Sequence, residues 1–185
     1  MTLHRRSVLK AAASFVSAAA LRDLAAQAPA PQSASVQVVG AGQDRFGPPR
    51  TLGFSSLAFK VASSDTGDNL FIIEHRNLMP GTGPALHLHF SQDEWFYVMD
   101  GEVVFQVGDE HARLRSGESV LGPGRIPHTF SAIGSPAHML IAFAPAGMME
   151  QYFIDAAAHP SLASTADFMN RYEMRWMGPS PFWKS

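Results

Sequence analysis

The sequence predicts an all-β domain, a barrel or sandwich of short strands flanked by helices near the C-terminus. Between residues 36 and 143, short apolar runs rich in Val, Ile and Phe alternate with Gly, Pro and Asp, a pattern typical of short strands joined by tight turns. No segment between these runs has the spacing of a crossover helix, so an α/β fold with a parallel sheet is not expected. Apolar residues recur at helical spacing only after Pro145.

The composition is that of one globular domain. Of the 185 residues, 46% are hydrophobic and 16% are charged, which is too apolar for a disordered chain. The formal net charge is −2, and residues 29–185 alone carry 10 basic and 15 acidic side chains. A mildly acidic chain without a basic cluster argues against binding to nucleic acid or to an anionic membrane. The chain has no cysteine, which excludes disulfides, thiolate metal sites and cysteine nucleophiles.

Residues 1–28 are predicted to be a cleaved export signal. The segment 4–10, His-Arg-Arg-Ser-Val-Leu-Lys, precedes an uncharged, alanine-rich stretch over 11–21, which is too short to cross a bilayer as a helix. It resembles the twin-arginine export motif, although Val8 stands where that motif usually has Phe. The mature protein would be periplasmic or secreted, without stable membrane association. An ordinary amphipathic helix is the alternative interpretation.

A linker is expected over residues 29–35, where Ala, Pro, Gln and Ser offer nothing to bury. The barrel is expected over residues 36–144. Its strands are predicted at residues 36–39, 52–61, 70–78, 94–99, 103–107, 119–121 and 138–143. The clearest hairpin follows strand 103–107, turns at residues 108–110 and returns to Leu114.

Because the first strand follows a flexible linker, it could add to the sheet of a second copy, and a homodimer is expected.

Residues 145–185 are predicted to form a helical tail. Pro145 is well placed before a first helical turn. The apolar residues that follow it at helical spacing are Met148, Met149, Tyr152, Phe153 and Ala156. A second helix is expected over residues 164–175, with Thr165 as its cap. We interpret these methionines and aromatic residues as core packing rather than as a cofactor site.

Three histidines and one glutamate have the spacing of a metal site. His87 and His89 are separated by one residue in an extended stretch, so both side chains leave the same face of a strand. A short bend could bring Glu94 back to that face, and His128 could reach it from another strand of the same barrel. Three neutral imidazoles and a carboxylate suit one divalent transition metal ion (Fe, Mn, Ni, Cu or Zn) with positions left open.

The other histidines are interpreted differently. A lone histidine is more often a hydrogen-bonded surface or core group than a ligand, and this interpretation is applied to His4, His75, His111 and His159. His138 lies at the edge of an apolar strand and could orient a group in a pocket.

Glycines extend the pattern around the first three candidate ligands. Gly81, His87, His89, Glu94 and Gly101 are separated in turn by five, one, four and six residues. Every spacing matches the first motif of the cupin superfamily, which the sequence resembles in this segment.

The second cupin motif is matched by Gly117, Pro123 and His128. Arg125 stands where the internal glycine of that motif belongs, and Ala132 stands where its terminal Asn is expected. Because a non-glycine residue resists a positive φ, the first departure puts the shape of this turn in doubt. Neither departure removes a ligand.

The resemblance implies a single-domain cupin of the cupin-2 type. The fold would be a double-stranded β-barrel, or jelly roll, over about residues 36–143, with short C-terminal helices. The implied metal ligands are His87, His89, Glu94 and His128. Within the superfamily the sequence most resembles the quercetinase-like group, the flavonol dioxygenase-like cupins. The segments that carry this likeness are 94–98, 101–102, 127–130, 145–147 and 178–181.

Strand alternation also predicts the substrate pocket. It places Phe96 and Val98 on the inward face of their strand, so the pocket is expected to be apolar beyond the metal. Phe130 and His138 are expected to line it as well. Arg125 is the one cationic residue placed to meet a carboxylate or enolate of the substrate. The alternative interpretation is that Arg125 is a solvated arginine of the loop.

These observations predict a metal-dependent dioxygenase that acts on a small aromatic or enol-containing molecule. The metal would acidify an enol and activate it toward O2, with Glu94 as a ligand or as the catalytic proton acceptor. In the flavonol dioxygenases that the chain resembles, the corresponding glutamate is assigned both roles. The alternative is a non-redox cupin that binds or isomerises a small ligand or sugar, because the same four ligands serve such proteins too.

Overall fold

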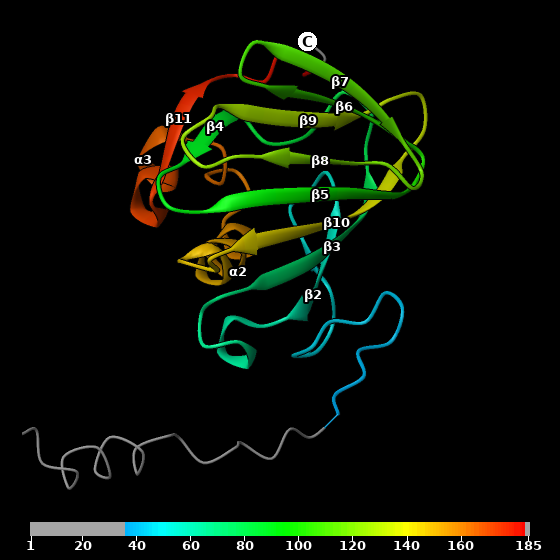
Figure 1. Ribbon diagram of the computed structural model, residues 1–185, viewed down its shortest axis with the longest axis vertical. Helices are drawn as coiled ribbons and strands as arrows, with labels where there is room; N and C mark the ends of the chain where they lie inside the picture. Colours follow the sequence, from blue (N-terminus) through cyan, green and yellow to red (C-terminus); the bar gives the residue numbers. More distant parts are fainter. Residues whose placement is uncertain (1–35, 184–185) are drawn as a thin grey trace, which may run out of the picture. The chain divides into compact units, whose positions relative to one another are not determined.

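The computed structural model describes residues 36–183, and the fold from Val38 onward consists of two antiparallel β-sheets (Figure 1). The larger sheet has the strand order β1-β2-β3-β10-β5-β8. These strands are β1 (Arg50–Thr51), β2 (Ser56–Val61), β3 (Phe71–Leu78), β10 (Ala137–Ala144), β5 (Asp93–Asp100) and β8 (Ser119–Gly122). The smaller sheet has the order β11-β4-β9-β6-β7. Its strands are β11 (Met174–Gly178), β4 (Leu86–His89), β9 (His128–Ala132), β6 (Glu102–Val107) and β7 (Glu110–Arg115).

The inward faces of the two sheets meet in an aromatic core. In β5, Phe96 is fully buried, whereas its neighbour Trp95 is 39% exposed on the other face, as strand alternation requires. The ring of Phe96 lies 5.0 Å from that of Phe105 and 5.4 Å from that of Phe130, both in the opposite sheet. Each phenylalanine buried in this way stabilises the fold by about 1.5–3 kcal/mol. The predicted all-β fold is confirmed.

The predicted hairpin is present as strands β6 and β7. Val107 pairs with Glu110 across the turn, and Gly108 has a φ of +60°, a conformation that a residue with a Cβ adopts at a cost. Sequence pattern and turn chemistry therefore agree in this segment.

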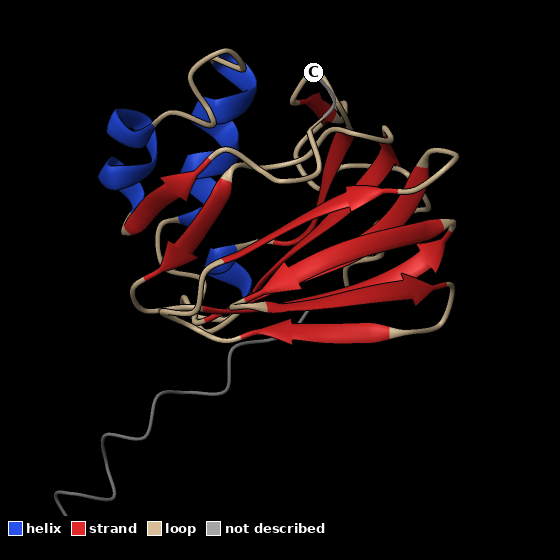
Figure 2. Ribbon diagram, turned by 90° about the horizontal axis from the view of Figure 1, so that it is seen from above, coloured by secondary structure: helices blue, strands red, loops and turns tan. Residues whose placement is uncertain are grey.

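Short helices gather at one end of the sheets, as Figure 2 shows. Helix α2 (Met149–Ala158) buries the face that its spacing predicts, formed by Met149, Tyr152, Phe153 and Ala156. Helix α3 (Ala166–Met169) is followed by the 3-10 helix η2 (Asn170–Tyr172). A further 3-10 turn, η1, covers Ser63–Asp65. Within the described residues, no helix has the length and apolar character needed to cross a membrane.

The end of the chain differs from the predicted helical tail. The second helix was expected to reach residue 175, but the backbone turns at Glu173, where φ is +57°, and continues as strand β11. This strand pairs with β4, with Met174 opposite His89 and Trp176 opposite His87. Such pairing joins residues 85 and 89 positions apart in the chain, so local helical spacing could not reveal it.

The predicted first strand is also wrong, because residues 36–39 belong to no strand. β1 begins only at Arg50. The predicted signal over 1–28 and linker over 29–35 lie outside the described residues.

Candidate metal centre

Four buried side chains from both sheets converge inside the barrel. His87 and His89 lie on β4, and His128 lies on the neighbouring strand β9. Glu94 lies on β5 of the facing sheet. Each offers one ligand atom, and these four atoms all lie within 4.8 Å of one another. The structure therefore brings together the four residues that the sequence predicts as ligands.

Backbone pairing fixes how these side chains meet. The two histidines of β4 share one face because side chains two residues apart in a strand point the same way. In the pairing of β4 with β9, His87 lies directly opposite His128. Glu94 lies between Phe143 of β10 and Gly122 of β8. A Cβ on Gly122 would lie 3.3 Å from the ring of His128, so glycine leaves room for that imidazole.

The distances within the cluster suit a bound cation. Glu94 Oε2 lies 2.8 Å from His128 Nε2 and 3.1 Å from His89 Nε2. Adjacent ligands at about 2.1 Å from one ion are about 3.0 Å apart. These two pairs therefore already have the spacing of adjacent ligands of one ion.

Hydrogen bonds orient two of the imidazoles toward the common centre. Nδ1 of His87 is 2.8 Å from the carbonyl oxygen of Ala85, and Nδ1 of His128 is 2.9 Å from that of Ile126. Donation from Nδ1 leaves Nε2 free as a lone-pair donor, the usual arrangement behind a metal-bound histidine. His89 is fully buried. Its Nδ1 has no hydrogen-bond partner, and its Nε2 lies 3.1 Å from Glu94 Oε2 without forming a hydrogen bond. A buried polar group without a partner is costly, and an ion would remove that cost.

The electrostatics also favour a cation. Burial raises the pKa of Glu94, but the hydrogen bond with His128, the close contact with His89 and the charges of these groups outweigh it and hold the pKa below its usual range. Burial, reinforced by repulsion from His128 and His89, lowers the pKa of His87 to about 3. Burial also lowers the pKa of His128, but the hydrogen bond and charge of Glu94 more than offset this and raise it. An ionised carboxylate and a neutral imidazole are the ligand forms that metals require, and burial and the neighbouring groups hold Glu94 and His87 in these forms.

A small, mainly apolar cavity adjoins the cluster. Its volume is about 30 Å³, which is room for about two water molecules. Beside His87, His89 and Glu94 it is lined by Leu52, Phe54, His75, Pro84, Phe130, Ile141, Phe143, Met149, Tyr152, Phe153, Ala163 and Ser164. None of these residues is Lys or Arg, so the cavity walls do not favour an anionic ligand.

Sequence and structure comparisons agree with this architecture. Residues 75–143 match the family model described as Cupin domain. This segment is therefore similar to cupin domains. Among solved structures, KdgF from Halomonas sp. is 16% identical over 60% of this chain and 94% of its own, with a TM-score of 0.52. A predicted oxalate decarboxylase from Thermotoga maritima is 18% identical over 59% of this chain and 99% of its own, with a TM-score of 0.53.

An RmlC-like cupin from Shewanella frigidimarina is 17% identical over 61% of this chain and 93% of its own, with a TM-score of 0.51. At these identities the three structures show the shared fold. No curated protein sequence matches the chain.

His75 is the cavity residue that our histidine assignment missed. It lies on β3, is 2% exposed, and its Nδ1 has no hydrogen-bond partner. Alternation within β3 could have revealed it, because Phe71, Ile73 and His75 share one face and all three are buried. The other two described histidines in that group, His111 and His159, are exposed as expected.

Only part of the predicted pocket lines the cavity. Phe130 does so, and its buried ring packs edge-on against His75 at 6.1 Å. Phe96 and Val98 are fully buried and face inward as predicted, but they belong to the core behind the site. Phe96 instead packs against the ring of His128 at 6.0 Å, so it supports a candidate ligand.

Arg125 was expected in the pocket, and the structure places it elsewhere. It is exposed at the turn before β9, where its Nε donates a hydrogen bond to the carbonyl oxygen of Phe90. Its φ is +67°, so this non-glycine residue adopts the left-handed conformation that the cupin motif assigns to glycine. Its backbone N–H donates to the carbonyl oxygen of His89 at 2.7 Å, which ties the turn to β4.

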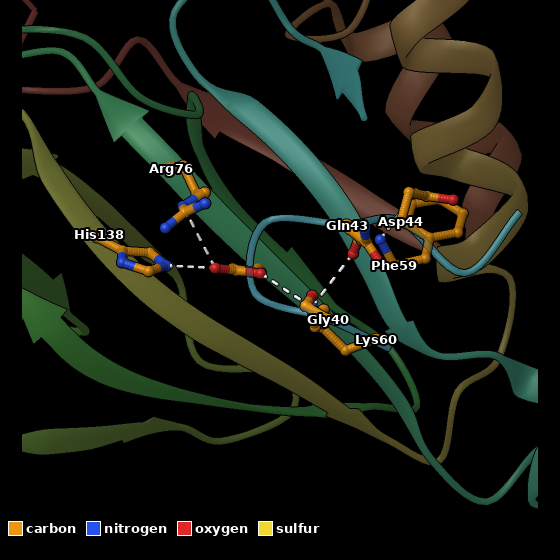
Figure 3. A network of polar contacts seen from close by, with 8 residues as sticks. Gly40, Gln43, Asp44, Phe59, Lys60, Arg76 and His138 are labelled. Atoms are coloured by element: carbon orange, nitrogen blue, oxygen red, sulfur yellow. Dashed lines mark hydrogen bonds and ion pairs between the residues drawn. The ribbon is translucent and has the colours of Figure 1, made fainter. Parts of the chain in front are cut away.

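His138 was also expected in the pocket, and this prediction is wrong. Met139 and Ile141 point into the core, so alternation along β10 turns His138 to the outer face. There its Nε2 lies 2.7 Å from Oε1 of the buried Glu74, which Lys60 also contacts at 3.1 Å (Figure 3).

Arg76 completes this outer cluster, with its Nε 3.3 Å from Oε1 of Glu74 (Figure 3). Burial raises the pKa of Glu74, but the hydrogen bonds from Lys60 and His138 and the charges of Lys60 and Arg76 leave it below its usual value. The cluster stabilises the carboxylate and lies apart from the cavity.

Proposed function

We propose that the protein is a metal-dependent oxygenase of the quercetinase-like kind, acting on a small, neutral, enol-containing or aromatic molecule. The metal site is supported by the convergence of four buried side chains, those of His87, His89, Glu94 and His128. Within this cluster, the ring nitrogens of His89 have no hydrogen-bond partner in the protein. The observation that favours an enol over a phosphorylated or polyanionic substrate is the cavity wall, which carries no Lys or Arg.

The four ligands would leave one or two positions open toward the cavity. A bound divalent ion supplies Lewis acidity there and, if it is redox-active, a route for electrons to O2. Glu94 can accept the enol proton, because its neighbours hold it in the ionised form. The apolar walls exclude bulk water from the reacting oxygen atoms.

The size of the cavity narrows the substrate class. A volume of about 30 Å³ accommodates about two water molecules, so any organic substrate must displace the cavity walls, and a short 1,3-diketone requires a smaller displacement than a flavonol. A three-ring flavonol would require displacement of the walls formed by Leu52, Phe54 and Ser164. These three residues also line an outer groove, which makes them the route of entry from the surface.

Oxygen consumption tests the proposal. Protein loaded separately with Fe, Mn, Ni, Cu or Zn would be assayed in an oxygen electrode with 2,4-pentanedione, catechol and a flavonol. We expect O2 uptake with at least one redox-active ion, strongest for the diketone, and none with Zn. Turnover that does not need O2 would instead support the non-redox cupin, and absence of turnover with every ion and substrate would contradict the oxygenase.

We also propose that residues 1–28 export the protein by the twin-arginine route. This route carries folded proteins, so a weakly bound ion such as Mn or Fe could be inserted before Cu and Zn compete. Periplasmic fractionation of the full chain and of an Arg5→Lys/Arg6→Lys variant tests this. Equal amounts of both in the periplasm would contradict it.

A further inference from the structure

We infer that His75 is a specificity-determining residue, which forms a hydrogen bond with a second polar group of the substrate while the first occupies the metal centre. This inference rests on the proposed function and names a feature of its substrate: two polar ends joined by a short apolar link. The residue lies outside the four-residue metal cluster.

The first observation is that His75 is buried without a protein partner. Its side chain is 2% exposed, lines the cavity, and leaves Nδ1 without a hydrogen-bond partner. Most buried polar atoms in proteins are satisfied, and an exception on a cavity wall is a position where a ligand or water atom can bind. Two aromatic rings orient the imidazole, because Phe130 and Phe153 pack edge-on against it at 6.1 and 6.3 Å.

The second observation is the place of His75 relative to Glu94. Along β10, His75 pairs with Met139 and Glu94 pairs with Phe143. These backbone positions are four residues apart along β10, but both side chains reach one cavity of about 30 Å³, so their polar ends lie much closer together than their backbones. Because both side chains line the same cavity, they form two polar groups at separate points of its apolar wall.

The third observation concerns charge. Burial lowers the pKa of His75 to about 3, although the charge of Glu94 acts in the opposite direction. The imidazole is therefore neutral at physiological pH and offers one donor and one acceptor. A hydroxyl or carbonyl group suits such a partner, whereas a carboxylate would want a cation, and the cavity walls carry no Lys or Arg.

The other polar side chains of the cavity wall do not provide the same function. Tyr152 already donates its hydroxyl hydrogen to the carbonyl oxygen of Ala163 at 3.0 Å. Ser164 lies where the cavity meets the outer groove, so it serves the entrance. Apart from the four candidate ligands, His75 is thus the inner cavity residue with free hydrogen-bonding capacity among the described residues.

Matched pairs of hydroxamic acids test the inference without a known substrate. A hydroxamate chelates a metal with one end, and the other end can carry a hydroxyl or not. The pairs are aceto- and glycolohydroxamic acid, propiono- and 3-hydroxypropanohydroxamic acid, and butyro- and 4-hydroxybutanohydroxamic acid. Each would be titrated into the Co(II)-loaded protein, with binding followed by the visible Co(II) spectrum.

One hydrogen bond contributes about 0.5–1.5 kcal/mol, so the hydroxylated member of at least one pair should bind about 3- to 10-fold more tightly to the wild type. In His75→Leu this ratio should fall to about 1, while the unsubstituted hydroxamates keep their affinity. His75→Gln, which retains a donor and an acceptor, should restore part of the preference. Cobalt content and circular dichroism of the variants would establish that fold and metal are retained.

The outcomes separate the two proposals. If the protein binds cobalt and hydroxamates but no pair shows a preference that depends on residue 75, the role of His75 is refuted and the metal centre stands. If the protein binds neither cobalt nor any hydroxamate, the proposed metal centre fails, and the inference that rests on it fails too. Should His75→Leu be unfolded, His75→Phe, which also removes both ring nitrogens, would replace it, and an unchanged preference in that variant with cobalt retained would refute the role of His75.

Discussion

A single methyl group added at Gly83 should disturb both the fold and the metal centre. A Cβ at this position would lie 2.1 Å from the carbonyl oxygen of Phe130. Ordinary contacts begin near 3.4 Å, so β4 and β9 would have to separate by about 1 Å. These strands carry His87 and His128, which face each other across that pairing, and metal–ligand distances tolerate only about 0.2 Å.

Gly47 provides a matched control for Gly83→Ala. Both glycines precede a proline, and their φ angles are similar, +136° at Gly83 and +144° at Gly47. A Cβ at Gly47 would meet nothing within 4 Å. The backbone strain of about 1–3 kcal/mol is therefore common to both variants, and only Gly83→Ala adds an overlap that costs about another 1–3 kcal/mol.

Urea unfolding of the chelator-treated proteins measures the loss of stability, and competition with a metal indicator measures the loss of metal affinity. Gly83→Ala should lower the free energy of unfolding by about 1–3 kcal/mol more than Gly47→Ala. It should also weaken metal binding by about 10- to 100-fold, the range seen when support behind a ligand is lost, while Gly47→Ala leaves the affinity unchanged. Equal free-energy losses, with a metal affinity of Gly83→Ala within twofold of wild type, would refute the reasoning.

Three further predictions concern stability. Glu74→Gln should lower the free energy of unfolding by about 1–3 kcal/mol at pH 7. Folding lowers the pKa of Glu74 from 4.5, so the carboxylate stabilises the folded protein above about pH 4.5 and loses this effect as the pH falls further. In urea titrations, the difference in free energy of unfolding between wild type and Glu74→Gln should therefore be smaller at pH 3.5 than at pH 7. An equal difference at both pH values would argue against the ion cluster. A metal ion at 1,000 times its dissociation constant should raise the free energy of unfolding by about 4 kcal/mol, which corresponds to a rise of about 8–16 °C in the Tm measured by calorimetry. A similar rise in Tm for His87→Ala would show that the ion binds elsewhere. Tyr172→Phe removes a 2.5 Å hydrogen bond to Asp155 and should cost about 0.5–1.5 kcal/mol in thermal unfolding, whereas an unchanged Tm would mean that water replaces the bond.

The candidate ligands could be predicted from the sequence because their geometry is local. His87 and His89 meet by strand alternation alone, and the glycines around them fix the turns. Glu94 needs only a short bend to follow them. His128 required a long-range assumption, and it was the cupin spacing of Gly117 and Pro123 that supported it.

The rest of the site depends on contacts that no local pattern encodes. His75 reaches the cavity because β3 lies two strands away from β5 in the larger sheet, and strand order is set by the whole fold. His138 was misplaced because alternation fixes which residues share a face, not which face is the inner one. Arg125 was misplaced because its Nε bonds to the carbonyl oxygen of Phe90, a contact between two loops.

Metal analysis of protein purified without a histidine tag tests the central claim most directly. Plasma mass spectrometry should find about one transition metal ion per wild-type chain, and the same amount in His111→Ala/His159→Ala, which removes two exposed histidines. His87→Ala/His128→Ala should contain almost none while keeping the β-sheet circular dichroism spectrum. An unchanged metal content in that folded double variant would contradict the account.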